Sequence, residues 1–226
     1  MELTEKLQQK INNGREYRSM QMDVAEADDY MVEGYATTFD DPYHLYFDAK
    51  GRDVKEMVSR DAFLNTDMSD VIFQYDHEGR VFARLSNDTM KLEVDEHGLK
   101  VRAYLGGTEI GRNLYEEIKG GYTNKMSFGF TVAKDKVEPD GNGFLRKIFS
   151  VGKLFDVSAV SLPANNLTEI SARSHCDGAI AEIDEEIHRL EEEQRMKAEK
   201  KEILLVKLNA LKGVKNGNQR NADERH

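Results

Sequence analysis

The chain has 226 residues, of which 39% are hydrophobic and 33% charged, and its formal net charge is −10. This length allows one sizeable domain with an appendage. The acidic balance argues against a nucleic-acid partner, because neutralising phosphates requires clustered Lys and Arg, and no apolar run approaches the roughly 18 residues needed to span a membrane. The N-terminus lacks the apolar core of a signal peptide. The single cysteine, Cys176, cannot form an internal disulfide, which fits a reducing compartment.

Composition divides the chain into four parts. Residues 1–29 are polar and only patchily apolar, and we interpret them as an N-terminal arm without chemistry. Residues 30–174 carry the short apolar and β-branched runs expected of a folded body. Residues 175–212 are rich in charged residues at helical spacing, and residues 213–226 are almost free of apolar residues and are predicted to be disordered.

The body is predicted to consist mainly of short strands. Runs of β-branched and aromatic residues bounded by turn residues occur at 30–39, 54–58, 71–75, 81–85, 90–94, 99–104, 125–130, 134–137, 144–149 and 154–162. Residues 109–119 instead place Ile110, Leu114 and Ile118 on one helical face, with Thr108 as the N-cap. A second short helix is predicted to start at 59–63. The predicted fold class is therefore α+β, with a few short helices and mostly antiparallel strands.

The charged C-terminal part has an apolar stripe at heptad spacing. Its apolar members are Ile180, Ile183, Ile187, Leu190, Leu204, Leu208 and Leu211, and polar Gln194, Lys197 and Lys201 interrupt the stripe in the middle. This pattern indicates a protruding helix or coiled coil, because the remaining positions are almost uniformly charged. A helix packed on its own domain is the alternative, and the polar middle also allows a helical hairpin.

Ser127 is the candidate nucleophile. It lies in the apolar segment 125–130, in which two Phe and one Met would share one face of a strand while Ser127 shares the other with Gly129. The hydroxyl therefore lies beside a residue that has no side chain, which leaves room for a substrate. The alternative is a serine that only fills a tight place in a sheet.

A serine acts as a nucleophile only if a base accepts its proton, and histidine is the usual base. Of six histidines, only His77 lies at the end of a buried-type strand, where a rigid element can aim it. The other five lie in a loop, a turn, a domain edge, the charged helix or the tail: His44, His97, His175, His188 and His226. His77 is therefore the candidate general base.

Asp156 is the candidate for the residue that orients the histidine. It is a charge inside the otherwise apolar strand 154–162, where a charge needs a partner or a purpose. An edge-strand aspartate that faces solvent is the alternative. In this mechanism backbone N–H groups stabilise the oxyanion, and Gly129 is our suggestion for one such donor.

No metal or cofactor is expected. Asp76, His77 and Glu78 are metal-ligand types in a row, but neighbours on a strand point to opposite faces and cannot converge on one ion. The sequence has no Cys pair, phosphate loop or dinucleotide-binding glycine motif. Cys176 next to His175 imitates a thiol enzyme only superficially, because it lies at a linker without a supporting framework.

These motifs, in this order, resemble one known family. His77, a Gly-bounded helix, Met-Ser-Phe-Gly-Phe at 126–130, Asp-Val-Ser at 156–158 and Pro-Ala-Asn at 163–165 resemble the prohead (capsid maturation) proteases of tailed bacteriophages. The opening strand with Gly-Tyr-Ala at 34–36 and the segment 59–63 also match the pattern. The sequence departs from the family pattern at two points. An Asn usually precedes the catalytic His, where this chain has Asp76. An Asp, with Gly-Arg further on, usually follows that His, whereas Glu-Gly-Arg follows His77 immediately.

The resemblance implies a serine endopeptidase with a β-barrel-like body similar to assemblin, the herpesvirus maturation protease. His77 and Ser127 match the catalytic pair, and Asp156 matches the acidic third position. The implied substrates are the major capsid protein precursor or its scaffolding segment, and the protease itself. The implied location is the assembling procapsid in the host cytoplasm. Relatives of this fold tend to dimerise, so a homodimer is compatible with the sequence but not required by it.

Two alternatives come from the C-terminal helix. One is a non-enzymatic capsid assembly or scaffolding protein, with a β-rich body and a coiled-coil arm. The other is a fused protease and scaffold, in which the helix itself is the scaffold.

Overall fold

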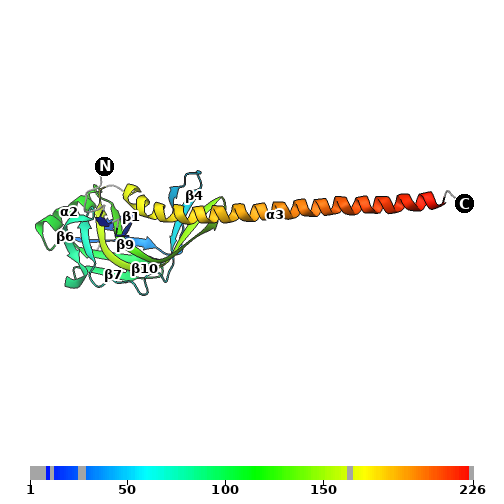
Figure 1. The fold of residues 1–226 in the computed structure, drawn as a ribbon. Coiled ribbons are helices and arrows are strands. Elements are labelled where there is room, and N and C mark those ends of the chain that lie inside the picture. The colour runs from blue at the N-terminus through cyan, green and yellow to red at the C-terminus, as the bar shows by residue number, and fades with distance from the viewer. Residues whose placement is uncertain (1–8, 11–12, 25–28, 162–164, 224–226) are drawn as a thin grey trace. The chain divides into compact units, whose positions relative to one another are not determined.

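The computed structural model describes residues 9–10, 13–24, 29–161 and 165–223. The chain divides into two units, Met1–Gly178 and Ala179–His226. Within the described ranges, the strands and the short helix α2 (Glu109–Lys119) lie in the first unit, and the second unit consists of most of the long helix α3 (Asn165–Asp223), as Figure 1 shows. The predicted α+β class with mostly antiparallel strands is confirmed.

One ten-stranded sheet forms the first unit. Its strand order is β3-β4-β10-β9-β1-β2-β8-β7, and β5 pairs with β10 and β6. All pairings are antiparallel except those of β10 with β4 and β5. The strands are β1 (Glu16–Val24), β2 (Met31–Thr38), β3 (Tyr43–Phe47), β4 (Asp53–Val58), β5 (Ile72–Tyr75), β6 (Glu78–Arg84), β7 (Met90–Val94), β8 (Gly98–Tyr104), β9 (Lys125–Asp140) and β10 (Gly143–Val160).

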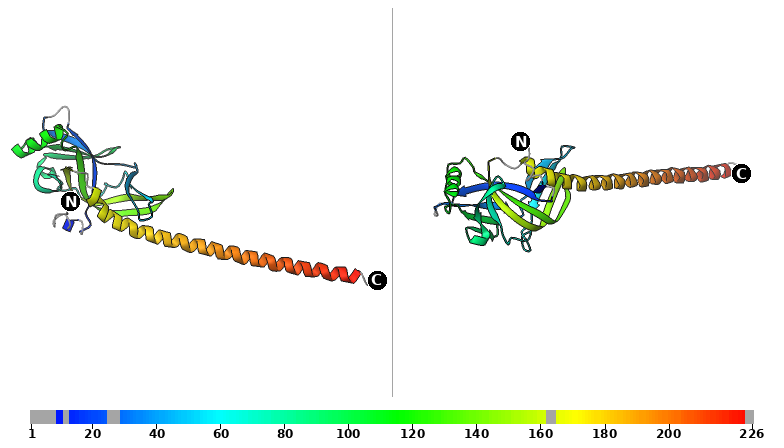
Figure 2. Two further views of the ribbon diagram at one scale, coloured as in Figure 1. Left: turned by 90° about the horizontal axis from the view of Figure 1, so that it is seen from above. Right: turned by 60° about the vertical axis from the view of Figure 1, so that its left-hand side comes forward.

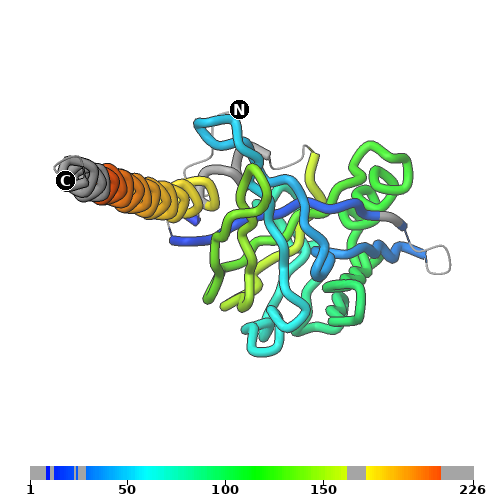
Figure 3. The backbone as a smooth tube through the Cα atoms, turned by 90° about the vertical axis from the view of Figure 1, so that its right-hand side faces the viewer, coloured from blue at the N-terminus to red at the C-terminus, as the bar shows by residue number. Residues whose placement is uncertain are grey.

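Strand β1 corrects the interpretation of residues 1–29 as an arm. Its first part pairs with β9, from Glu16 to Gln21, and its last part pairs with β2, from Met22 to Val24. In Figure 3 the blue segment of β1 crosses the body. The strand was missed because it is polar, and its charged residues are buried in partnership with other charges. Leu3, Leu7 and Ile11, whose spacing in the sequence allows a short helix, lie outside the described residues.

Strands β9 and β10 form one long hairpin, which Figure 2 shows in yellow-green. The sequence predicted two separate strands in each, because the apolar pattern is interrupted. The structure accommodates these interruptions with irregularities in pairing, such as those between Ile148 and Ser150 and between Leu154 and Asp156. Bulges of this kind keep a strand continuous while they re-aim its side chains.

Helix α2 (Glu109–Lys119) matches its predicted bounds. The Thr108 hydroxyl accepts a hydrogen bond from the Gly111 backbone N–H at 3.0 Å, as an N-cap should. Leu114 and Ile118 are buried in the main hydrophobic core. The second predicted helix, at 59–63, is wrong, because this segment runs into a series of turns. A 3-10 turn, η1 (Leu85–Asn87), lies further along the chain.

A buried ionic cluster links side chains of strands β1, β4, β9 and β10. The guanidinium of Arg18 donates to Glu56 at 2.5 Å, and that of Arg146 donates to Glu16 at 2.7 Å and to Asp135 at 2.5 Å. Burial would raise the pKa of Glu16, but Arg18 and Arg146 outweigh it and lower that pKa to about 2. Such a cluster locks its strands together, because removing one partner leaves a buried charge uncompensated.

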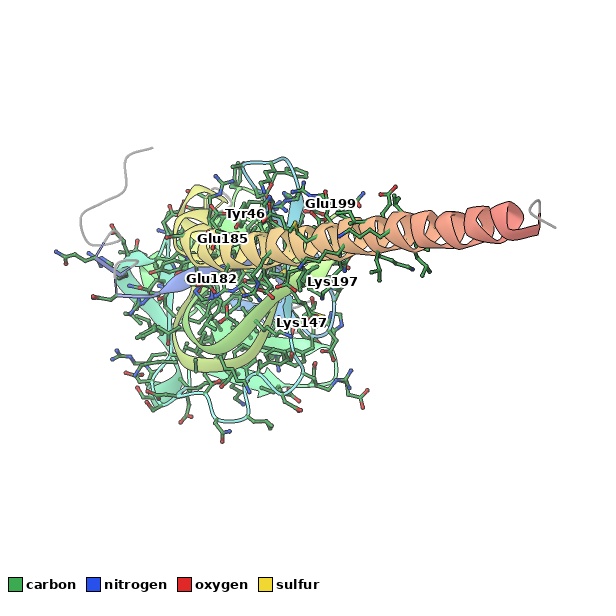
Figure 4. All side chains as sticks on the ribbon, turned by 45° about the vertical axis from the view of Figure 1, so that its right-hand side comes forward. Tyr46, Lys147, Glu182, Glu185, Lys197 and Glu199 are labelled. Carbon is green, nitrogen blue, oxygen red and sulfur yellow. The ribbon has the colours of Figure 1, made fainter. Side chains whose placement is uncertain are left out.

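The second unit is helical along its described length. Its apolar side chains between Ile187 and Leu208 are mostly exposed, and the labelled Glu182, Glu185 and Lys197 come from this helix in Figure 4. Helix α3 includes residues 213–223, which the sequence predicted to be disordered.

Candidate active site

A tight turn carries His77. Strands β5 and β6 are joined by only Asp76 and His77, whose φ angles are 47° and 60°. Left-handed backbone at both positions is the geometry of a two-residue hairpin turn that normally favours Asn-Gly. The turn is anchored because the Asp76 carboxylate accepts hydrogen bonds from the Ser161 backbone N–H and hydroxyl, both at 2.9 Å. Strained backbone held in this way gives His77 a fixed direction.

His77 and Ser127 are in hydrogen-bonding contact. Ser127 lies in β9, between Ser19 of β1 and Ser158 of β10. Its Oγ is 2.8 Å from His77 Nε2, although 50 residues separate the two in the chain.

Asp156 lies behind the imidazole. Its Oδ1 is 2.5 Å from His77 Nδ1, and the Ser158 hydroxyl donates to the same oxygen at 3.2 Å. A carboxylate at Nδ1 favours the tautomer that carries its proton there, so Nε2 is left as an acceptor for the Ser127 hydroxyl. The structure therefore brings the three sequence-predicted residues into one hydrogen-bonded row, in the order that acyl-transfer chemistry requires.

Arg15 is a fourth member of the site, which the sequence did not indicate. Its Nη1 is 3.2 Å from Asp156 Oδ2, the carboxylate oxygen that His77 does not use. Burial alone would raise the pKa of Asp156, but the hydrogen bond and charge of His77, and the charges of Arg15 and Lys10, lower it. Asp156 is thus held ionised although it is only 1% exposed.

Tyr17 forms a wall of the site. Its ring centroid lies 4.3 Å from that of His77, with an angle of 58° between the planes. Burial, followed by the nearby charge of Asp156, raises the pKa of its phenol above the usual value. Arg15 immediately precedes β1 and lies two residues from Tyr17. Side chains two residues apart in an extended chain share one face, so both point toward His77 and Asp156 once β1 is recognised as a strand. Recognising that strand is the signal that would have revealed both residues.

Gly129 lies in the strand that the sequence predicted, and its neighbours there bear on the suggested oxyanion role. It lies in β9 between Tyr17 of β1 and Asp156 of β10, in a region paired on both sides. An N–H in such a strand points along the sheet toward a neighbouring strand, which argues against the suggested oxyanion role. The glycine has a packing reason instead, because a Cβ there would lie 2.8 Å from Asp156 Oδ2 and 2.8 Å from Tyr17 Cε1.

The row of catalytic candidates is closed to solvent. Ser127 is 0% exposed and His77 is 2% exposed. A peptide carbonyl can therefore reach Ser127 Oγ only after part of the surrounding chain moves.

Two other histidines and the cysteine considered as catalytic residues have partners or surroundings outside the row of Asp156, His77 and Ser127. His44 pairs with Asp53, and His175 pairs with Asp135. Burial raises the pKa of the Cys176 thiol to about 12, so the nucleophilic thiolate is disfavoured. Within the described ranges, no group of three or more His, Cys, Asp or Glu is arranged to hold a metal ion, and no helix is long and apolar enough to cross a membrane.

Comparison with known families gives one match. The model of the family described as Caudovirus prohead serine protease matches residues 16–179, which is most of the chain and includes all three residues of the row. No curated protein and no solved structure matches the chain.

Proposed function

This chain belongs to the Caudovirus prohead serine protease family, and from that premise we propose that Ser127, His77 and Asp156 are its catalytic residues. Membership makes the chain a serine protease of phage capsid maturation, which hydrolyses peptide bonds in capsid precursor proteins. The observation that carries the residue assignment is the row of hydrogen bonds from Asp156 Oδ1 through His77 to Ser127 Oγ, with distances of 2.5 and 2.8 Å.

The proposed reaction is acyl transfer. Ser127 Oγ attacks the scissile carbonyl carbon while His77 Nε2 accepts the hydroxyl proton, which gives a tetrahedral oxyanion. The intermediate collapses as the C–N bond breaks, and His77 returns the proton to the leaving amine. Water then adds to the acyl-enzyme with His77 as base, which releases the acid and restores Ser127. Asp156 stabilises the imidazolium that forms in each half.

The substrate and location are proposed more narrowly than the family requires. We assign as substrates the major capsid protein precursor or its scaffolding segment, and the protease itself, inside the procapsid in the host cell. The second unit supports this, because a helix with exposed apolar residues can bind an assembly component while the first unit holds the catalytic row. In a variant ending at Gly178, incorporation into proheads should fall while peptidase activity on a short peptide remains. Loss of the peptidase activity would contradict this division of roles.

The test of the assignment uses a serine-directed phosphonate and the variant Ser127→Ala. The phosphonate should attach once to the wild-type chain, at Ser127, and neither label nor precursor cleavage should be seen in Ser127→Ala, which should remain folded. Ser69→Ala is a matched control, because Ser69 is exposed and its hydroxyl donates to the carboxylate of Asp67. Cleavage by Ser127→Ala would reject the nucleophile. A wild-type chain that neither cleaves nor labels would favour the non-enzymatic scaffolding alternative.

A further inference from the structure

The second unit has a surface that its own chain leaves uncovered. Along α3 the side chains of Ile187, Leu190, Leu204 and Leu208 are 42%, 46%, 69% and 47% exposed. They follow heptad spacing with Ile183 at the start. Residues 183–208 span about 39 Å of helix at roughly 1.5 Å per residue, which is more than three heptads and long enough for a coiled coil. A stripe of this kind can pack against the matching stripe of a partner helix.

Charge is distributed unequally along this helix. Residues 182–193 contain seven carboxylates and one arginine, whereas residues 195–207 contain five basic residues and two glutamates. Two copies side by side in the same direction would place acidic half on acidic half. Two copies in opposite directions would place acidic half on basic half. We propose that α3 pairs with α3 of a second copy of this chain, in antiparallel orientation, through the seam between Ile183 and Leu208.

The seam spacing is compatible with that orientation. In an antiparallel pair each a residue faces a d residue of the partner, and the alternating 3 and 4 spacing reads the same from either end. One register sets Ile183 opposite Leu208 and Ile187 opposite Leu204, so that apolar side chains meet at both ends of the seam.

The polar middle of the stripe fits the same register. Gln194 then lies opposite Lys197, and Leu190 lies opposite Lys201, whose long aliphatic stem covers apolar surface while its ammonium reaches water. In a parallel pair Lys197 would face Lys197 and Lys201 would face Lys201 across the seam. Like charges opposed at the seam destabilise pairing.

The charged residues on either side of the seam also favour the antiparallel over the parallel orientation. In the antiparallel register Glu186 lies opposite Lys207, and Glu193 lies opposite Lys200, which gives four opposite-charge pairs in the dimer. In a parallel pair Glu186 would instead face Glu191 of the partner. In the single helix Glu186 pairs with Arg189. An exposed pair of that kind is weak and can rearrange on association. The dimer leaves Ile203 and Val206 exposed, because they lie outside the seam.

Sedimentation equilibrium of the full chain tests the proposal, with Ser127→Ala introduced to prevent self-digestion. We expect a reversible monomer–dimer equilibrium. The double variant Glu186→Lys with Glu193→Lys should weaken dimerisation on the order of tenfold or more, because four attractive pairs become repulsive. Adding Lys200→Glu and Lys207→Glu should restore it. A parallel dimer predicts the opposite first result, because Glu186→Lys would relieve repulsion there.

A matched control separates seam effects from net charge. Glu185→Lys with Glu192→Lys changes the charge by the same amount on the outer face of the helix, and should leave the dimer almost unchanged. Orientation is read from disulfide crosslinking: Ile187→Cys chains mixed with Leu204→Cys chains should crosslink to each other, and neither should crosslink alone. A chain that stays monomeric, or an Ile187→Cys chain that crosslinks with itself, would overturn the proposal.

Discussion

Arg15 Nη1 lies 3.2 Å from Asp156 Oδ2, on the opposite carboxylate oxygen from the one that contacts His77. The guanidinium is 17% exposed and also lies over the ring of Phe155, at 3.7 Å from its centroid. It therefore holds a buried carboxylate ionised and restrains its rotation.

Replacing Arg15 should change the pH profile as well as the rate. In Arg15→Gln, one charge-assisted contact worth about 1.5 kcal/mol is lost, so kcat should fall roughly tenfold. Because the charge of Arg15 is one of the causes that lower the pKa of Asp156, its loss should raise that pKa, and the acid limb of kcat/KM should move to higher pH. Both are measured from peptide cleavage as a function of pH.

Two further variants show whether position or charge is responsible. Arg15→Lys keeps a cation near Asp156 and should restore most of the wild-type acid limb. Arg60→Gln removes an arginine that is 60% exposed and pairs with Asp40 at the surface, and should change nothing. An unchanged acid limb in Arg15→Gln would show that Arg15 has only a structural role.

Gly129→Ala should impair catalysis by displacing Asp156. The added Cβ would lie 2.8 Å from the carboxylate oxygen, closer than real contacts permit, so the carboxylate must move away from His77. A misplacement of about 1 Å can cost on the order of a hundredfold in rate, and we expect it in kcat with little change in KM. Gly107→Ala is the control, because nothing lies within 4 Å of a Cβ there. Equal activity of the two variants would contradict the packing explanation.

The turn at Asp76 should be needed for both stability and activity. Asp76→Ala loses the hydrogen bonds to Ser161 and leaves a residue poorly suited to positive φ, which together should cost about 2 kcal/mol in the free energy of unfolding and reduce kcat/KM. Asp76→Asn should be nearly wild type, since its amide oxygen can accept the same bond and Asn tolerates left-handed backbone. Asp88→Ala is the comparison, because Asp88 also has a positive φ angle, 60°, but is not part of the row of Asp156, His77 and Ser127. It should lose stability without an intrinsic loss of activity.

The buried ionic cluster predicts sensitivity to acid. Glu16 has its pKa lowered from an ordinary 4.5 to about 2, so the stability it contributes is present above about pH 4.5 and is lost as the pH falls toward 2. The loss should be about 3 kcal/mol. Glu16→Gln should be less stable at neutral pH and show a flatter dependence between these limits, in urea unfolding of the Ser127→Ala chain. Glu93→Gln, at an exposed position, should keep the wild-type dependence.

The sequence predicted the elements whose pattern is local. Helix α2 was bounded correctly by Thr108 and the glycines that follow it, and His77, Ser127 and Asp156 were selected because each is a polar residue in an apolar strand or at its end. Strand β1 was missed because its buried residues include Glu16 and Arg18. Charges compensated by partners far along the chain give no local signal of burial.

The site contacts between residues far apart in the chain could not be predicted for the same reason, because they leave no local pattern in the sequence. Arg15 is 141 residues from Asp156 in the chain, and no spacing rule relates them. The pattern that suggested Gly129 as an oxyanion donor located a glycine but not the strands on either side of it, whose pairing argues against that role.

The double pairing of β1 has a practical consequence for anyone who prepares this enzyme. A version trimmed to begin near residue 30, where composition alone would place the folded part, would remove β1, the strand that joins β9 to β2. It would leave two long unpaired strand borders, which are ready templates for aggregation. Material recovered in inclusion bodies from such a truncation would therefore say nothing about the solubility of the intact protein.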